Sequence, residues 1–208
     1  MDFRKSAGEY AAPPAQDLSM QVTPTALPDV KIYQPKRFGD ARGYFSEWYN
    51  ARNFAAAGLD QLFVQDNLAF SAAAGTLRGL HYQKPPHAQG KLVGVLQGAI
   101  FDVALDIRRG SPTYGQHVSV ELSAELGNQI FVPPGFAHGY CTTRPDTLVT
   151  YNVTDFYHPE TEGGLLWNDP DLAIAWPVDG APQLAERDAR LPRLAELGQS
   201  PFAHEGSR

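Results

Sequence analysis

The chain contains many short β-rich segments, spaced about ten residues apart and separated by turn signals. Glycine and proline mark these turns, for example at residues 97–98, 109–112 and 133–135. Short segments of this composition, bounded by turns at regular spacing, predict an all-β sandwich or barrel. The predicted strands cover residues 30–33, 43–48, 62–68, 77–82, 91–97, 100–107, 117–122, 129–132, 139–142 and 148–153.

Helical signal is sparse and confined to three short segments. Residues 53–57 are rich in alanine, while residues 184–188 and 191–197 each fit a single turn. The two halves of the chain are both punctuated by glycine and proline, and each carries one candidate site histidine, His81 or His138. We therefore expect a double-stranded β-helix, the jelly roll of cupin-like barrels, with a few short helices. Such barrels bind ligands in their interior or at their mouth.

Length and composition set the expected domain organisation. Residues 1–19 are rich in alanine, proline and charge without periodicity, which predicts a disordered leader, and residues 20–208 then form a single domain. The net charge of -6 argues against a nucleic-acid partner. No apolar run approaches the roughly 20 residues of a membrane-spanning helix. The single cysteine, Cys141, suits a reducing compartment, so we expect a soluble cytoplasmic protein.

The strand segment Leu77–Gln83, followed by Lys91, brings a guanidinium, an imidazole and an ammonium close together. Alternation along a strand places Arg78 on the opposite face from His81. An imidazole titrates near neutrality and can remove a proton from carbon if the resulting anion is stabilised, which Lys91 could do. A core histidine and a solvated edge lysine fit the same residues, and both interpretations stay open at this point.

Three further residues are weaker candidates when each is taken alone. His138 follows the turn at residues 133–135, Tyr151 lies within a predicted strand, and Asp188 follows a polar run. Their ordinary interpretations are a turn histidine, a core tyrosine with a paired hydroxyl, and a solvated surface carboxylate.

Together these segments resemble the dTDP-4-dehydrorhamnose 3,5-epimerase family of nucleotide-sugar enzymes. The resemblance runs from about residue 22 to about residue 192 and lies in long, ordered motifs. These are FGDARGYF at 38–45, FVQDN at 63–67, LRGLHYQ at 77–83, HAQGKLV at 87–93, FDVALDIR at 101–108, GSPT at 110–113, PGFAHG at 134–139 and WNDP at 167–170.

The resemblance implies a metal-independent cupin without a cofactor, normally a homodimer. Family members convert dTDP-4-dehydro-6-deoxy-D-glucose to dTDP-4-dehydro-L-rhamnose by epimerisation at C3 and C5. Both carbons flank the C4 ketone, so removing either proton gives an enolate. By the resemblance, His81 is the base and Asp188 orients it. Lys91 lies beside the enolate oxygen, and Tyr151 is the acid on the other face of the sugar.

The resemblance also implies a set of substrate contacts. The guanidinium groups suit the diphosphate or sugar, an aromatic ring stacks on thymine, and amide and carboxylate groups lie at the nucleotide end. The set comprises Arg42, Glu47, Gln65, Asp66, Asn67, Arg78, His138, Tyr157, Glu162 and Arg187. Arg42 and Glu47 reach the site across the dimer interface in the family. Asp102 is expected to support the polar network inside the barrel.

Three alternatives to the double epimerase follow from the same residues. The first is a C3-only or C5-only epimerase of another deoxysugar pathway, which needs the same base, acid and oxyanion groups. The second is a metal-dependent cupin oxygenase with His81, His87 and His138 as ligands, although the tight histidine pair of iron cupins is missing. The third is a non-catalytic sugar-nucleotide binding module, which would need no base and acid.

Overall fold

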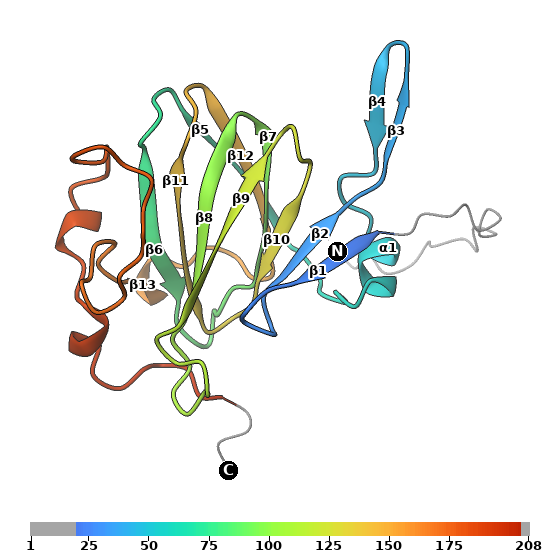
Figure 1. The fold of residues 1–208 in the computed structure, drawn as a ribbon. Coiled ribbons are helices and arrows are strands. Elements are labelled where there is room, and N and C mark those ends of the chain that lie inside the picture. The colour runs from blue at the N-terminus through green and yellow to red at the C-terminus, as the bar shows by residue number, and fades with distance from the viewer. Residues whose placement is uncertain (1–19, 205–208) are drawn as a thin grey trace.

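The structure, a computed structural model, describes residues 20–204. Two antiparallel sheets face each other and a separate hairpin projects from one end (Figure 1). This all-β jelly roll confirms the predicted fold class. The predicted leader at residues 1–19 lies outside the described residues, as do residues 205–208, so the single domain over residues 20–208 stays a prediction. Within residues 20–204, no helix is long and apolar enough to cross a membrane.

The larger sheet has six strands in the order β1-β2-β10-β7-β12-β5, and every pair in it is antiparallel. Its strands are β1 (Gln21–Pro24), β2 (Lys31–Gln34), β10 (Gln129–Val132), β7 (Lys91–Gln97), β12 (Thr147–Val153) and β5 (Gln65–Ser71). Strands far apart in sequence thus become neighbours, and β7 lies between β10 and β12.

The smaller sheet has five strands in the order β13-β6-β11-β8-β9. These are β13 (Glu162–Gly164), β6 (Leu77–Gln83), β11 (Phe136–Thr142), β8 (Ala99–Asp106) and β9 (His117–Ser123). Strands β3 (Arg37–Asp40) and β4 (Gly43–Ser46) form the projecting hairpin. The helices are α1 (Ala51–Ala56), η1 (Pro159–Thr161), η2 (Asp188–Arg190) and η3 (Leu194–Glu196).

Strand alternation sorts the side chains of β8 between two clusters. Ile100 and Ala104 belong to the core between the two sheets, whereas Val103 and Leu105 belong to a second cluster on the outer face. Asp102 falls between Ile100 and Ala104 in this register and is therefore buried inside the barrel. A carboxylate at an inward position marks where the interior becomes polar.

The segment after β13 covers the outer face of the smaller sheet. Leu165, Leu172 and Phe202 pack there against Leu80 and Tyr82 of β6. In Figure 1 this orange-to-red segment lies beside β6 and β13. Its packing brings η2 against β6, where Leu77 donates its N–H to Gln183 and Thr76 pairs with the same residue.

The observed elements differ from the predicted ones mainly at their ends. The predicted helix at residues 53–57 is α1, which begins two residues earlier because Asn50 caps its first turn. The predicted strand at residues 62–68 is shifted to β5, and that at residues 139–142 extends back to Phe136 in β11. Strands β1, β3 and β13 were not predicted from the sequence, because short strands next to turns carry little periodic signal.

Strand β6 contains one residue more than β11 across a short stretch. His81 pairs with His138 and Arg78 pairs with Tyr140, so three steps along β6 match two along β11, which is a β-bulge. Gly79 lies in the bulge with φ +119°, and an added Cβ there would come within 2.6 Å of the β11 backbone. The predicted placement of Arg78 and His81 on opposite faces is wrong, since both line one cavity.

A buried carboxylate organises the loop between β8 and β9. Asp106 accepts hydrogen bonds from Arg108, from Ser111 Oγ at 2.6 Å and from Thr113 Oγ1 at 2.6 Å. Burial alone would raise the pKa of Asp106, but these hydrogen bonds outweigh it and lower the pKa to about 2. Arg108 also contacts Asp29, which ties the loop to the segment before β2.

We expect Asp106→Asn to lower the free energy of unfolding at neutral pH by about 2 kcal/mol or more, because Arg108 loses its buried partner. A folded-state pKa of about 2 against an ordinary 3.8 means that this stabilisation is complete above about pH 5. It is lost as the pH falls towards 2. Urea unfolding between pH 2 and 7 measures this. The exposed Asp60→Asn is the control. If the free energy of unfolding depends on pH equally in wild type and in Asp106→Asn, the low pKa does not belong to Asp106.

Candidate active site

A cavity of about 690 Å³ opens between the two sheets at the end where the interior is polar. Both sheets and the segment around η2 contribute to its wall. The predicted site residues that line it are His81, Lys91, Tyr151, Asp188, Gln65, Asn67, Arg78, His138, Tyr157, Glu162 and Arg187. Side chains that are far apart in sequence therefore meet in one place.

His81 and Asp188 form a hydrogen-bonded pair in the cavity wall. His81 Nε2 lies 2.9 Å from Asp188 Oδ1, and Gly79 N donates to Asp188 Oδ2 at 3.3 Å. Asp188 is buried rather than solvated, because η2 packs against β6. Burial raises the pKa of Asp188, but the His81 hydrogen bond and charge outweigh this, and the pKa is lowered. An ionised Asp188 holds the proton on Nε2 and leaves the Nδ1 lone pair of His81 free.

Lys91 enters the cavity from β7, in the sheet opposite His81. Its Nζ donates to the backbone oxygen of His81 at 3.4 Å. Burial lowers the pKa of Lys91 to about 8, against the opposing effects of the Asp102 and Glu162 charges. At neutral pH the group is still an ammonium, poorly hydrated and close to the histidine. Such a cation interacts strongly with any anion that forms beside it.

Two tyrosines line the cavity, Tyr151 in the sheet that faces His81 and Tyr140 in the same sheet as His81. Tyr151 comes from β12 in the facing sheet, and burial raises the pKa of its hydroxyl although the Arg78 charge opposes this. Burial raises the pKa of Tyr140 to about 12. Both phenols are therefore protonated at neutral pH and able to donate. The Tyr140 hydroxyl has no hydrogen-bond partner among the described residues.

A second histidine–carboxylate pair lies deeper in the barrel. His138 Nε2 is 2.8 Å from Asp102 Oδ2, and both side chains are buried. This confirms the expectation that Asp102 supports the polar network. Tyr140 was missed by the sequence reasoning, although it stands two residues after His138 and so shares its face of β11.

Three side chains at the rim are joined by hydrogen bonds. Arg187 donates to both carboxylate oxygens of Glu162 at 2.8 Å, and Tyr157 Oη donates to Glu162 at 3.0 Å. Burial raises the pKa of Glu162, but the bonds from Arg187 and Tyr157 outweigh it and the pKa is lowered. The ring of Tyr157 is half exposed and presents a face to the cavity opening.

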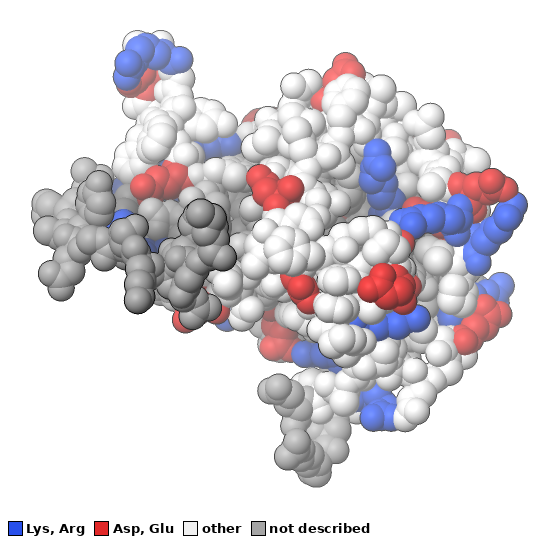
Figure 2. Space-filling model, turned by 180° about the vertical axis from the view of Figure 1, so that it is seen from behind, with Lys and Arg blue, Asp and Glu red and all other residues white. Residues whose placement is uncertain are grey.

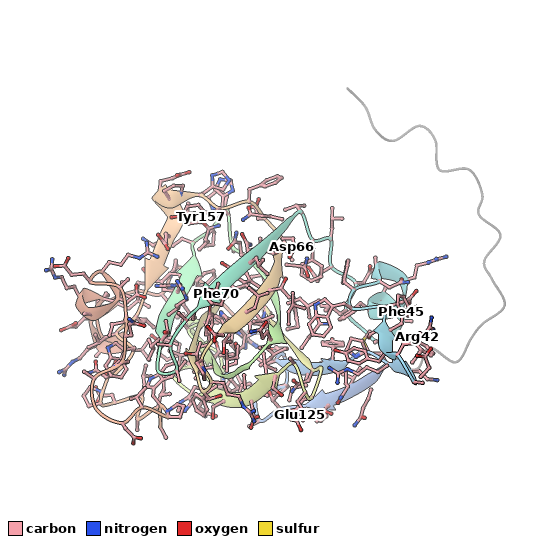
Figure 3. The ribbon with its side chains drawn as sticks, turned by 90° about the horizontal axis from the view of Figure 1, so that it is seen from above. Arg42, Phe45, Asp66, Phe70, Glu125 and Tyr157 are labelled. Atoms are coloured by element: carbon pink, nitrogen blue, oxygen red, sulfur yellow. The ribbon has the colours of Figure 1, made fainter. Side chains whose placement is uncertain are left out.

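Three predicted substrate contacts do not line this cavity. Asp66 accepts from Thr150 Oγ1 on the other face of β5, because alternation separates it from Gln65 and Asn67. Glu47 accepts from two asparagine side chains near α1. Arg42 lies on the projecting hairpin, and Figure 3 shows it with Phe45 on the side of the molecule away from Tyr157.

The three histidines of the oxygenase alternative are held apart. His81 pairs with Asp188 and His138 with Asp102, while His87 lies outside the barrel against Asp155. In residues 20–204 these three do not form a group with metal-ligand spacing. The geometry therefore gives no support to an iron site built from them.

The arrangement defines a jelly-roll enzyme whose cavity gathers an imidazole–carboxylate pair, a buried ammonium and two phenols. A family model described as dTDP-4-dehydrorhamnose 3,5-epimerase matches residues 24–196. The epimerase of that name from Pseudomonas aeruginosa is 51% identical over 178 residues, which are 85% of this chain and 97% of that protein. The chain thus belongs to the dTDP-4-dehydrorhamnose 3,5-epimerase family.

Solved structures agree with this assignment. The epimerase of Legionella pneumophila, solved with dTDP-4-keto-L-rhamnose, has 43% identity and a TM-score of 0.85, and the match covers 89% of this chain and 98% of that one. A 3′-monoepimerase of Streptomyces bikiniensis, solved with dTDP-quinovose, has 35% identity and a TM-score of 0.78, and the match covers 84% of this chain and 88% of that one.

The lowered pKa of Lys91 can be measured directly. We expect its ¹³Cε NMR signal in lysine-labelled protein to titrate with a midpoint near pH 8 rather than near its ordinary 10.5. Glu162→Gln should lower the midpoint further, because it removes a negative charge that favours the ammonium. Glu125→Gln, an exposed change, serves as the control. A midpoint near 10.5 in wild type would show that Lys91 is hydrated.

Proposed function

We propose that this chain epimerises dTDP-4-dehydro-6-deoxy-D-glucose at C3 and C5 to give dTDP-4-dehydro-L-rhamnose. The observation that carries this proposal is the placement of His81, paired with Asp188 of η2, in one sheet and of Tyr151 in the facing sheet, around one cavity. Inversion at carbon requires a base on one face of the sugar ring and an acid on the other. Two facing sheets supply groups on both faces.

In the proposed reaction, Nδ1 of His81 removes the proton from the carbon next to the ketone. The electron pair of that C–H bond forms a double bond to C4, and the π pair of the C4 ketone moves to O4, which becomes an enolate oxygen stabilised by the ammonium of Lys91. Asp188 stabilises the imidazolium that forms. Tyr151 then donates its proton to the opposite face of the carbon, the enolate returns to a ketone, and the centre is inverted. The resulting imidazolium and phenolate re-equilibrate their protons with water before the second carbon reacts.

Binding of the substrate is assigned to the remaining polar groups. Arg78 reaches the cavity through the β6 bulge, so its guanidinium is available to the diphosphate or sugar. His138 lies on the sugar side, and the exposed ring of Tyr157 suits stacking on thymine. Gln65 and Asn67 line the cavity for the nucleotide end. Figure 2 shows Lys and Arg interspersed with Asp and Glu on one face, in keeping with a small-molecule partner.

We also propose that the enzyme is a cytoplasmic homodimer whose sites are completed across the interface. The β3–β4 hairpin projects from its own barrel, and it exposes Tyr44 and Phe45, which are 60% and 66% exposed (Figure 1). Exposed aromatic side chains on a projecting element favour contact with another subunit. In a symmetric dimer the hairpin would carry Arg42 to the partner's cavity, and Glu47, which directly follows the hairpin, would reach the same cavity from its base.

The first test follows the substrate by proton NMR in deuterated water. We expect deuterium at both C3 and C5 with wild type and a loss of about a thousandfold in rate with His81→Ala, because general-base catalysis is removed. The control His117→Ala, outside the cavity, should behave as wild type. Exchange at one carbon alone would favour the single epimerase. That reaction is the second candidate, because the chain is also similar to a 3′-monoepimerase. No exchange would refute both and favour the binding module.

The acid is tested by separating proton removal from inversion. Tyr151→Phe should still exchange deuterium into recovered substrate, because His81 and Lys91 are intact, while inverted product forms far more slowly. Reduction with borohydride and analysis of the trapped sugars measures the product. Equal loss of exchange and product would show that Tyr151 is not the acid, and Tyr140→Phe tests the neighbouring phenol as its replacement.

The shared site is tested by mixing two inactive variants. One carries His81→Ala, and the other carries Arg42→Ala with Glu47→Ala. A mixed dimer has one cavity with both an intact base and an intact partner hairpin, so co-expression should restore about a quarter of wild-type activity. If the mixture stays inactive although mixed dimers are isolated by two affinity tags, the hairpin acts within its own subunit.

A further inference from the structure

Two histidines and two carboxylates gather outside the cavity, at its rim. The rings of His87 and His158 stack with centroids 3.5 Å apart and planes at 15°. His87 Nδ1 lies 3.1 Å from Asp155 Oδ2, and His158 Nδ1 lies 3.1 Å from Glu160 Oε1. The proposed epimerisation uses none of these four side chains.

The geometry points to a binding site for a transition-metal dication such as Zn²⁺, with His87, His158 and Glu160 as ligands. One potential ligand atom from each of the three lies within 4.8 Å of the others. The 3.1 Å between His158 Nδ1 and Glu160 Oε1 is close to the roughly 3.3 Å that separates two ligands on a tetrahedral zinc ion. His87, at 31% exposure, and Glu160, at 66%, have room to close around an ion.

The environment of His87 favours metal binding through its other nitrogen. With Nδ1–H donating a hydrogen bond to Asp155, the Nε2 lone pair is available, and this carboxylate–imidazole arrangement is typical of metal-bound histidines. Glu160 Oε1 lies within hydrogen-bond distance of His158 Nδ1, so each of the two imidazoles has a carboxylate beside it. Imidazoles and carboxylates side by side form a donor set that a transition-metal dication binds.

The donor set restricts the class of metal. Imidazole and carboxylate groups without a thiolate suit Zn²⁺, Ni²⁺ or Cu²⁺, whereas Mg²⁺ and Ca²⁺ prefer oxygen ligands throughout. Three protein ligands leave one tetrahedral position for water. The ion is separate from the proposed base, since His81 has its own partner inside the cavity.

A buried side chain connects this cluster to the cavity. Gln83 lines the cavity, accepts from His158 N at 2.7 Å, and donates to the backbone oxygens of His87 and Phe156 at 3.2 and 3.0 Å. An ion held by His87 and His158 would cross-link the turn after β6 to the segment that carries Tyr157. The site therefore lies where an ion would fix the rim without touching the reacting groups.

Zinc binding to tag-free, full-length protein tests the proposal by calorimetry with Zn²⁺ alone. We expect one Zn²⁺ per chain, with affinity reduced at least tenfold by His158→Gln and about tenfold or more by Asp155→Asn. His117→Gln and His81→Gln should bind zinc as wild type does. The Co²⁺-loaded protein should show the visible absorption of a tetrahedral site, and His158→Gln should lose it. Because Glu160 is exposed, Glu160→Gln provides a second variant if His158→Gln fails to fold.

Several results would overturn the site. These are no zinc binding by wild type, unchanged affinity in both His158→Gln and Glu160→Gln, or loss of binding in His81→Gln instead. Turnover separates this site from the proposed activity, since enzyme treated with a chelator should epimerise its substrate normally. Failure of zinc binding with normal turnover would reject the metal site alone. Failure of turnover with normal zinc binding would reject the epimerase proposal alone.

Discussion

One buried carboxylate joins the C-terminal segment to the barrel and sets the orientation of the proposed base. The side chain of Asp188 is 3% exposed, and an ionised group at that depth needs partners. It finds them in His81 Nε2 and the N–H of Gly79, which lies in the β6 bulge. The apolar packing of Leu165 and Leu172 against β6 holds the segment in place. Folding of the last quarter of the chain is therefore a condition for an oriented His81.

The interior of the jelly roll is divided between an apolar and a polar half. Where the sheets pack closely, Ile100, Val93 and Val149 exclude water. Towards the cavity, the same inward positions carry Asp102, His138 and Lys91, and the negative charge of Asp102 offsets part of the cost of burying the Lys91 ammonium. This environment lowers the pKa of Lys91 and keeps the tyrosines protonated. One barrel thus provides both a stable core and a polar site shielded from water, in which a single ammonium has a large effect.

Strand composition and turns predicted the all-β jelly roll and most of its strands, because branched residues and glycine or proline act locally. Ordered motifs identified the family and most of the cavity residues. Local signals failed at Asp188, whose polar neighbours suggest a surface position although η2 is buried against β6. They failed also at Arg78, because a bulge depends on the partner strand and leaves no mark in the periodicity of β6 itself.

The sequence by itself determined the fold class, the family and the chemical identity of the groups that meet in the cavity. The tertiary structure decided how they meet: which nitrogen of His81 is free, which sheet supplies Tyr151, and that Asp66 points away from Gln65 and Asn67. It also brought His87 and His158, 71 residues apart, into a stacked pair at the rim. Side-chain types are local properties of the chain, whereas distances, burial and pKa shifts arise only when strands far apart in sequence pair.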